Sequence, residues 1–203
     1  MKLVVMTKPT YFVEEDKILS TLFDGGLDWL HLYKPGCAPM YAERLLTLLP
    51  ECYHRRIFVH DHFYLIKEYG LAGICTETAD EELPAGYKGK YTRTCRDLEL
   101  LKGAKKRAEY VLLKYIFDSQ SEREGKGLFT LRELEEAARR GLIDKHVYAL
   151  GGMNLENIRI ARDLGFGGVA ICGDLWNRFD IHKGADYREL LVHFEKLLKE
   201  VKR

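Results

Sequence analysis

Short hydrophobic stretches alternate with longer amphipathic segments along the whole chain. Eight of these stretches are rich in apolar residues: 3–7, 28–33, 56–60, 72–75, 90–94, 109–114, 146–150 and 168–172. Near-continuous apolar runs are typical of strands that are buried on both faces of a parallel sheet. The clearest are the segments VLL at 111–113 and VAIC at 169–172.

Amphipathic helical patterns lie between these strands, at residues 14–26, 39–49, 131–140, 154–164 and 187–202. Several end at ordinary stop signals, such as Pro50, Gly141 and Gly165. No linker interrupts the alternation, so we predict one domain over residues 1–203 with an α/β fold, a single (β/α)8 TIM barrel. An open, doubly wound parallel sheet is the alternative. No GxGxxG motif follows the first strand, which disfavours dinucleotide binding.

The charge composition argues against nucleic acid and membranes as binding partners. The chain has 203 residues and a formal net charge of +1, with 32 Lys and Arg against 31 Asp and Glu. This balance gives no electrostatic attraction to nucleic acid or to an anionic membrane.

No apolar run approaches the roughly 20 residues of a membrane span, and no signal-peptide pattern opens the sequence. The five cysteines are scattered without a CxxC pair, as in reduced thiols. We therefore expect a cytoplasmic protein. The sequence leaves both a monomer and a homo-oligomer possible.

Glycines follow the last two predicted strands, where a barrel often binds phosphate. Gly151 and Gly152 come before a helix predicted to begin near Asn154, and Gly173 follows the eighth strand. Glycine lets a phosphate approach the backbone, and a helix N-terminus offers free N–H groups. The sequence therefore predicts binding of a small phosphorylated molecule here. The alternative is that these glycines only form tight turns.

Two aspartates, Asp61 and Asp80, follow the third and fourth predicted strands. Carboxylates from adjacent loops suit Mg²⁺ that is shared with a substrate phosphate or pyrophosphate. Alternatively, Asp61 is the N-cap of the next helix, because Asp is a preferred residue there.

Other polar side chains are expected at the same end of the barrel, where active sites of this fold lie. Lys34, before Pro35 and Gly36, is a candidate for an anion contact. The remaining candidates follow strands two, three, five and six: His31, Tyr33, His60, Thr94, Arg96, Ser119 and Ser121.

Taken together, these motifs resemble the thiamine-phosphate synthase and TenI family of small barrels, over nearly the whole chain. The segments ALGGM at 149–153 and GFGGVAI at 165–171 are close to the family's seventh and eighth strands. The segments RTCRDLE at 93–99 and KYIFDSQSE at 114–122 fit its fifth and sixth strands less closely. In these, Thr94 stands for a Ser and Arg96 for a His, while Ser119 and Ser121 stand for two threonines. Asp61 and Asp80 fall on the family's magnesium aspartates, and His60 replaces an Asn.

Two cationic positions of the family differ here. Tyr33 stands at the Arg position of strand two, and Glu122 stands at the Lys position after strand six, beside Arg123. In the synthase these cations hold the pyrophosphate leaving group, so another basic residue must substitute. The candidates are Lys34, Arg93, Arg96, Arg123 and Lys126.

The resemblance implies an enzyme of thiamine biosynthesis that uses Mg²⁺. It would join hydroxymethylpyrimidine diphosphate to thiazole phosphate and release pyrophosphate, with Lys34, His60 and Arg96 as catalytic candidates. The alternatives are a TenI-like thiazole tautomerase, with His60 or His31 as base, and a non-catalytic binder of phosphorylated ligands. Apart from the resemblance, a phosphosugar isomerase or aldolase is a further candidate, with Lys114 where a Schiff-base lysine could lie.

Overall fold

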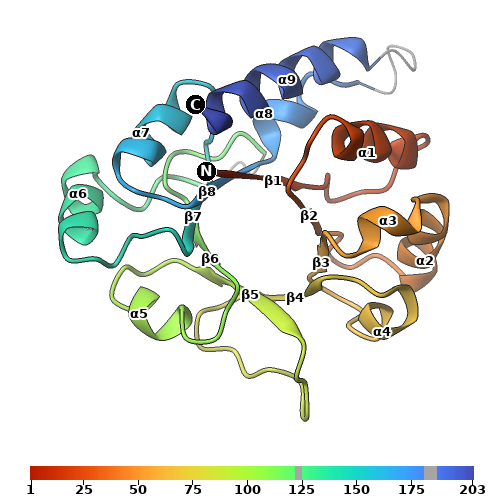
Figure 1. Ribbon diagram of the computed structural model, residues 1–203, viewed down its shortest axis with the longest axis horizontal. Helices are drawn as coiled ribbons and strands as arrows, with labels where there is room; N and C mark the ends of the chain where they lie inside the picture. Colours follow the sequence, from red (N-terminus) through yellow and green to blue (C-terminus); the bar gives the residue numbers. More distant parts are fainter. Residues whose placement is uncertain (122–124, 181–186) are drawn as a thin grey trace.

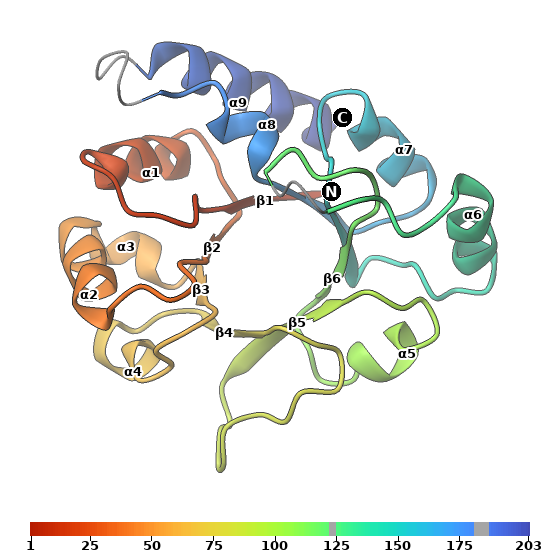
Figure 2. The same ribbon diagram turned by 180° about the vertical axis from the view of Figure 1, so that it is seen from behind.

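Parallel strands close into a barrel in chain order, with helices around its outside (Figures 1 and 2). The computed structural model describes residues 1–121, 125–180 and 187–203, and within them the barrel has eight strands. These are β1 (Lys2–Met6), β2 (Trp29–Leu32), β3 (Ile57–Val59), β4 (Gly73–Thr76), β5 (Lys90–Cys95), β6 (Val111–Lys114), β7 (Val147–Leu150) and β8 (Gly168–Ile171). Every neighbouring pair is parallel, and β1 pairs with both β2 and β8. The (β/α)8 barrel is confirmed, and the open sheet is excluded.

Within the described residues, the structure contains the five predicted helices and four further short ones. The five predicted ones are α1 (Glu15–Asp24), α2 (Pro39–Leu48), α6 (Leu131–Arg139), α7 (Asn157–Asp163) and α9 (Arg188–Lys202). The four short helices are α3 (Glu51–His54), α4 (Leu65–Tyr69), α5 (Leu101–Ala104) and α8 (Gly173–Trp176), of which only α4 was expected, as the helix that Asp61 would cap. Each is too short to show a hydrophobic period in the sequence.

Local sequence explains where the longer helices start. Pro39 occupies the first turn of α2, where its missing N–H costs nothing. Thr130 caps α6 by accepting a hydrogen bond from the backbone N–H of Glu133, and the Glu133 side chain accepts one from the N–H of Thr130. This capping box satisfies two donors that the helix itself leaves unpaired.

The core has two layers because successive strand residues face opposite sides. Leu3 and Val5 of β1 pack outward against the helices, whereas Val4 and Met6 pack inside the barrel. The interior also holds aromatic rings, and Tyr110 stacks on Tyr148 with 4.1 Å between the ring centroids. The barrel is therefore filled by side chains, which leaves a ligand only the space at its ends.

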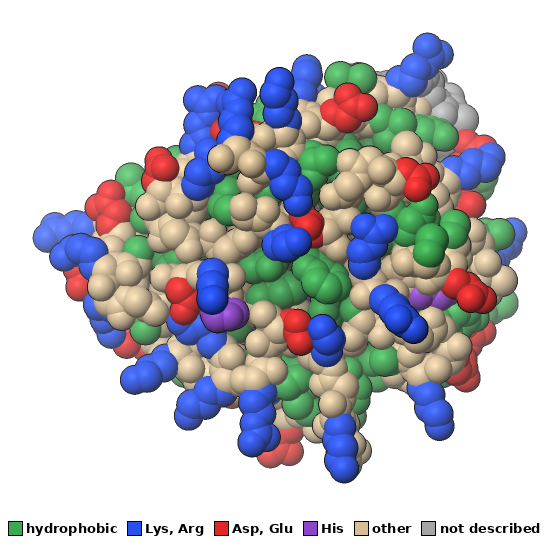
Figure 3. Space-filling model, viewed as in Figure 1, with side chains coloured by type: hydrophobic (Ala, Val, Ile, Leu, Met, Phe, Trp, Pro, Cys, Tyr) green, Lys and Arg blue, Asp and Glu red, His purple; other side chains and the backbone are tan. Residues whose placement is uncertain are grey.

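The surface mixes charges of both signs. On the face seen in Figure 3, Lys and Arg side chains are interspersed with Asp and Glu around a central group of hydrophobic side chains. None of the helices in the described ranges combines the length and the apolar character that a membrane crossing requires.

Candidate active site

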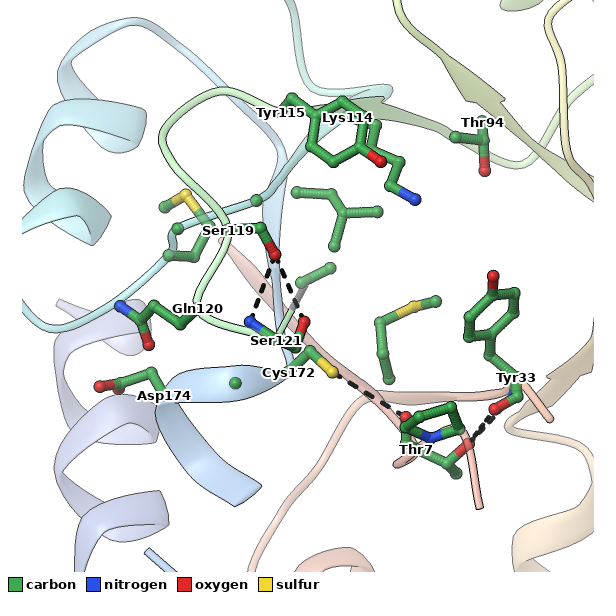
Figure 4. A pocket seen from close by; sticks show the side chains of 18 of the residues that line it. Thr7, Tyr33, Thr94, Lys114, Tyr115, Ser119, Gln120, Ser121, Cys172 and Asp174 are labelled. Atoms are coloured by element: carbon green, nitrogen blue, oxygen red, sulfur yellow. Dashed lines mark hydrogen bonds between the residues drawn. The ribbon is translucent and has the colours of Figure 1, made fainter. Parts of the chain in front are cut away.

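A cavity of about 250 Å³ opens at the carboxyl-terminal ends of the strands (Figure 4). All eight strands contribute to it, either with their last residues or with the residues that follow. The lining consists of Met6, Thr7, Pro9, Tyr33, Pro35, His60, Glu77, Thr94, Lys114, Tyr115, Ser119, Gln120, Ser121, Leu150, Gly151, Gly152, Met153, Ala170, Cys172, Gly173 and Asp174.

The cavity brings together most of the residues singled out in the sequence. Those that line it are Tyr33, His60, Thr94, Ser119, Ser121, Gly151, Gly152 and Gly173. Those outside its lining are His31, Lys34, Asp61, Asp80 and Arg96. These eight residues therefore lie around one cavity. The substrate-binding and catalytic roles that the sequence analysis assigned to them stay predictions.

The glycines after β7 and β8 let another loop pack directly against them. Gly151 and Gly152 have φ angles of 103° and 64°, which other residues rarely adopt. A Cβ on Gly152 would lie 2.5 Å from the backbone oxygen of Asp118, and one on Gly173 would lie 2.7 Å from the backbone carbon of Gln120. Tight turns and close loop approach therefore both require glycine here.

The amides of these turns are the donors that a phosphate would use. Within the described residues, the N–H groups of Gly152 and Gly173 donate to no backbone acceptor. The expected helix start differs, however. The side-chain oxygen of Asn154 accepts from the N–H groups of Glu156 and Asn157, each at 2.9 Å, and α7 begins only at Asn157. Asn154 thus occupies two amides that were predicted to face the phosphate.

The loop after β6 contributes hydroxyl groups to the same side of the cavity. The Ser121 N–H donates to Oγ of Ser119 at 3.3 Å, and the two Oγ atoms are 3.4 Å apart. Gln120 is held to α8 because the Asn177 side chain donates to its carbonyl at 3.2 Å. Figure 4 shows Ser119 and Ser121 across the cavity from Tyr33.

Lys114, the last residue of β6, supplies a cation to the lining. Its Nζ lies 4.7 Å from the ring centroid of Tyr115, and the guanidinium of Arg96 lies 5.2 Å from the same centroid. Arg96 is exposed beyond this ring. Lys114 had been considered only as a Schiff-base lysine. Its position at a strand end also suits a contact with an anion.

A hydrogen-bonded chain of side chains reaches the cavity from the barrel interior. The Tyr110 hydroxyl lies 2.6 Å from Nε2 of His31, and Nδ1 of His31 lies 2.9 Å from Nε2 of His60. Nδ1 of His60 then lies 2.6 Å from Oε1 of Glu77, whose side chain is half-exposed. His31 is thus a buried support of His60, and Glu77 is a further lining residue that the sequence reasoning assigned no role.

Their surroundings shift the pKa values of the two hydrogen-bonded histidines, His31 and His60, in opposite directions. Burial, with a smaller contribution from His60, holds the pKa of His31 well below its usual range. Burial also disfavours the charged form of His60, but Cys75 and Glu77 outweigh it and raise the pKa of His60 to about 10. The hydrogen bond from His60 lowers the pKa of Glu77. In this pair the His60 imidazolium can donate a proton and the Glu77 carboxylate can accept one.

Lys34 points away from the cavity into a buried ion pair. Its Nζ lies 2.5 Å from Oε1 of Glu15 and donates to the carbonyl of Thr10 at 3.0 Å. It also lies 4.4 Å from the ring centroid of Tyr11. Burial lowers the pKa of Lys34, against the opposing effect of Glu15. In this arrangement Lys34 fixes the chain after β2, and its contact with an anion stays a prediction.

Asp61 and Asp80 are exposed on the loops after β3 and β4. Neither carboxylate has a hydrogen bond or an ion pair to another residue of the described ranges. Asp61 caps no helix, because α4 begins after Tyr64 without a side-chain cap. Carboxylate oxygens are ligands that Mg²⁺ prefers, but neither aspartate lines the cavity, so their role as metal ligands stays a prediction. Glu122 and Arg123 lie outside the described residues.

Comparison with solved structures gives full-length matches. The chain is 44% identical to thiamine phosphate pyrophosphorylase from Bacteroides thetaiotaomicron, covering 100% of this chain and 98% of that one, with a TM-score of 0.89. Thiamine phosphate pyrophosphorylase from Pyrococcus furiosus is 19% identical, with coverage of 99% and 95% and a TM-score of 0.74. The tryptophan synthase alpha subunit of Legionella pneumophila, at 14% identity, 99% and 92% coverage and a TM-score of 0.66, shares the fold. No family model and no curated protein sequence matches.

Fold and site together define a (β/α)8-barrel protein whose cavity lies at the strand ends, beside glycine turns after β7 and β8. Identity of 44% over the full length narrows this class to one family. The chain belongs to the thiamine-phosphate synthase and TenI family.

Proposed function

We propose that this protein is an enzyme of thiamine biosynthesis that joins hydroxymethylpyrimidine diphosphate to thiazole phosphate. In this reaction the bond between the pyrimidine methylene carbon and the diphosphate oxygen breaks, and the thiazole nitrogen forms a new bond to that carbon. The observation that carries the proposal is the 44% identity, over the whole chain, to a protein described as thiamine phosphate pyrophosphorylase.

In this proposal the thiazole phosphate binds at the turns after β6, β7 and β8. The Ser119 and Ser121 hydroxyls and the N–H groups of Gly152 and Gly173 are the donors on that side of the cavity. Oriented neutral donors suit a phosphate because they add hydrogen bonds without requiring a buried counter-charge. Gly151 completes the turn that presents them.

The diphosphate would bind toward β3, β4 and β6. Lys114 lines the cavity and Arg96 lies beside it over Tyr115, so these cations support the leaving group where the family's own lysine is missing. Asp61 and Asp80 would hold Mg²⁺, which supplies charge neutralisation to a diphosphate when bound. Thr94 and Tyr33 offer hydroxyl groups to the pyrimidine between these two regions.

A second candidate is thiazole tautomerisation, which needs only a proton to be moved. The contact between His60 and Glu77 favours it, because a histidine paired with a carboxylate at a cavity wall suits general acid–base catalysis. Arg96, at the family's strand-five histidine position, cannot release a proton at neutral pH. Binding without turnover is the remaining alternative.

A turnover assay with purified protein separates these functions. With Mg²⁺ and both precursors, the synthase proposal expects thiamine phosphate and pyrophosphate in equal amounts, and expects EDTA to abolish both. A tautomerase would instead convert the thiazole phosphate isomer in EDTA and form no thiamine phosphate. Binding of thiazole phosphate with neither reaction would overturn both enzyme assignments.

A further inference from the structure

Three potential metal ligands from adjacent strands meet inside the barrel, beneath the cavity. They are His31 of β2, His60 after β3 and Cys75 of β4, and one ligand atom of each lies within 4.8 Å of the others. Their exposed fractions are 0%, 6% and 0%. Within residues 1–121, 125–180 and 187–203 no other group of three His, Cys, Asp or Glu side chains meets this condition. The geometry points to a Zn²⁺-type site, separate from the carboxylates of Asp61 and Asp80.

The histidine rings are already oriented as metal ligands usually are. Metal-binding histidines generally place their second nitrogen against a carboxylate or another hydrogen-bonding group, which fixes the ring and its tautomer. Here Nδ1 of His60 is held by Glu77 at 2.6 Å, and Nε2 of His31 is held by the Tyr110 hydroxyl at 2.6 Å. The inner nitrogens, Nδ1 of His31 and Nε2 of His60, therefore face each other.

The inner nitrogens lie 2.9 Å apart, so one shared proton satisfies both of them without a metal. In a tetrahedral site with Zn–N distances of about 2.0–2.1 Å, two ligand nitrogens lie roughly 3.3–3.4 Å apart. To admit the ion, the two nitrogens would have to separate by about half an ångström, and the Cys75 sulfur would have to move to bonding distance. Binding would release the shared proton together with the thiol proton of Cys75.

Cys75 already interacts with His60 through its sulfur, and its other protein partners are weak, which leaves the sulfur available as the third ligand. Its Sγ lies 3.7 Å from the Thr76 carbonyl and 3.8 Å from Oγ1 of Thr94. Two imidazoles and one thiolate select a borderline or soft ion such as Zn²⁺, whereas Mg²⁺ requires oxygen ligands. Three protein ligands leave a fourth position open, as in catalytic zinc sites. Because His60 and Thr94 also line the cavity, that position lies near its floor.

Cobalt substitution tests the site directly and does not depend on turnover. Metal-stripped protein titrated with Co²⁺ should bind one ion per chain. It should show the thiolate-to-cobalt charge-transfer band in the near ultraviolet and the visible bands of a four-coordinate ion. One equivalent of Zn²⁺ should abolish these bands, whereas millimolar Mg²⁺ should leave them unchanged.

Matched cysteine variants identify the ligand. Cys75→Ala should lose the charge-transfer band and weaken Co²⁺ binding at least a hundredfold, whereas Cys52→Ser, at an exposed thiol on α3, should keep both. Cys75 is buried, so a second pair of variants, Cys75→Ser and His31→Gln, guards against a folding defect in Cys75→Ala. Circular dichroism checks the fold of each variant. Absence of the band in the wild type would overturn the site. So would its persistence in any folded Cys75 variant, or its equal loss in Cys52→Ser. The synthase proposal can fail in the turnover assay without changing any of these outcomes.

Discussion

Nζ of Lys34 lies 2.5 Å from Oε1 of Glu15, and both side chains are buried. Glu15 is the first residue of α1 and Lys34 follows β2, so the ion pair joins two successive elements of the barrel. Oε2 of Glu15 is buried and has no hydrogen-bond partner among the described residues. Burial therefore raises the pKa of Glu15 to about 7, although Lys34 opposes the shift.

We predict that Glu15 makes stability fall as the pH rises. Its folded-state pKa of about 7 lies above the ordinary value of 4.5. The folded state holds this proton more tightly, so the contribution is complete below the ordinary pKa and is lost as the pH rises through the folded value. In urea unfolding at a series of pH values, the free energy of unfolding of the wild type should decline relative to Glu15→Gln between these two values. A constant difference across the range would contradict the prediction.

Gly152→Ala should weaken binding of thiazole phosphate at least tenfold, which corresponds to about 1.4 kcal/mol. The new Cβ would meet the Asp118 oxygen at 2.5 Å and displace the loop that carries Ser119. Isothermal titration calorimetry measures the change. Gly141→Ala is the matched control, since its φ angle of 71° imposes similar strain but its Cβ has no neighbour within 4 Å. Unchanged affinity in folded Gly152→Ala would remove this turn from the phosphate site.

Lys114→Gln should lower kcat about tenfold or more, because a charge-assisted hydrogen bond contributes about 1.5–3 kcal/mol. The lysine lines the cavity, and the family's cation after strand six is missing here. Steady-state kinetics with the pyrimidine diphosphate as the varied substrate give the measurement. Lys102→Gln, exposed on α5, should behave as wild type. Wild-type kinetics of Lys114→Gln would assign the diphosphate to another cation.

Asp61→Asn should cut synthase turnover by about 10²-fold, because it removes one charge from a ligand of the proposed Mg²⁺. The side chain is exposed and has no protein partner in the described ranges, so the fold should be unaffected. Turnover measured against Mg²⁺ concentration should also show a higher requirement for the ion. Asp163→Asn, at the exposed end of α7, is the control. Equal turnover of both variants would mean that Asp61 does not hold the metal.

The hydrophobic pattern was sufficient to predict eight parallel strands, because a parallel strand buried on both faces is apolar along its length, but it left an open sheet as the alternative to the closed barrel. The β7 segment, Val147–Leu150, is buried at every position and was found almost to the residue. The start of α7 was placed too early, because the Asn154 side chain forms a turn that occupies the first amides. The presence of a capping residue type does not show from which backbone N–H groups its side-chain oxygen accepts hydrogen bonds.

Contacts between distant segments set the limits of what the sequence could predict. Lys34 was assigned to an anion because it follows a strand, but α1 provides Glu15 as its partner. His31 and His60 were predicted as site residues and Cys75 only as one of five reduced thiols, and only the register of β2, β3 and β4 brings the three together. The alternation along each strand turns a residue inward, but the pairing of neighbouring strands, which places the three residues side by side, is contained in no local pattern.

β1 hydrogen-bonds to β2 on one side and to β8 on the other, where Val4 is in register with Ala170. During translation, the β8-facing edge of β1 stays unpaired until residues 168–171 leave the ribosome. At about 5–20 residues per second, the interval between the synthesis of Met6 and Gly168 lasts roughly 8–30 s. An open strand edge is a template for pairing with other chains. The barrel therefore cannot close, and this edge of β1 cannot be covered by its own partner, until the last strand has been made.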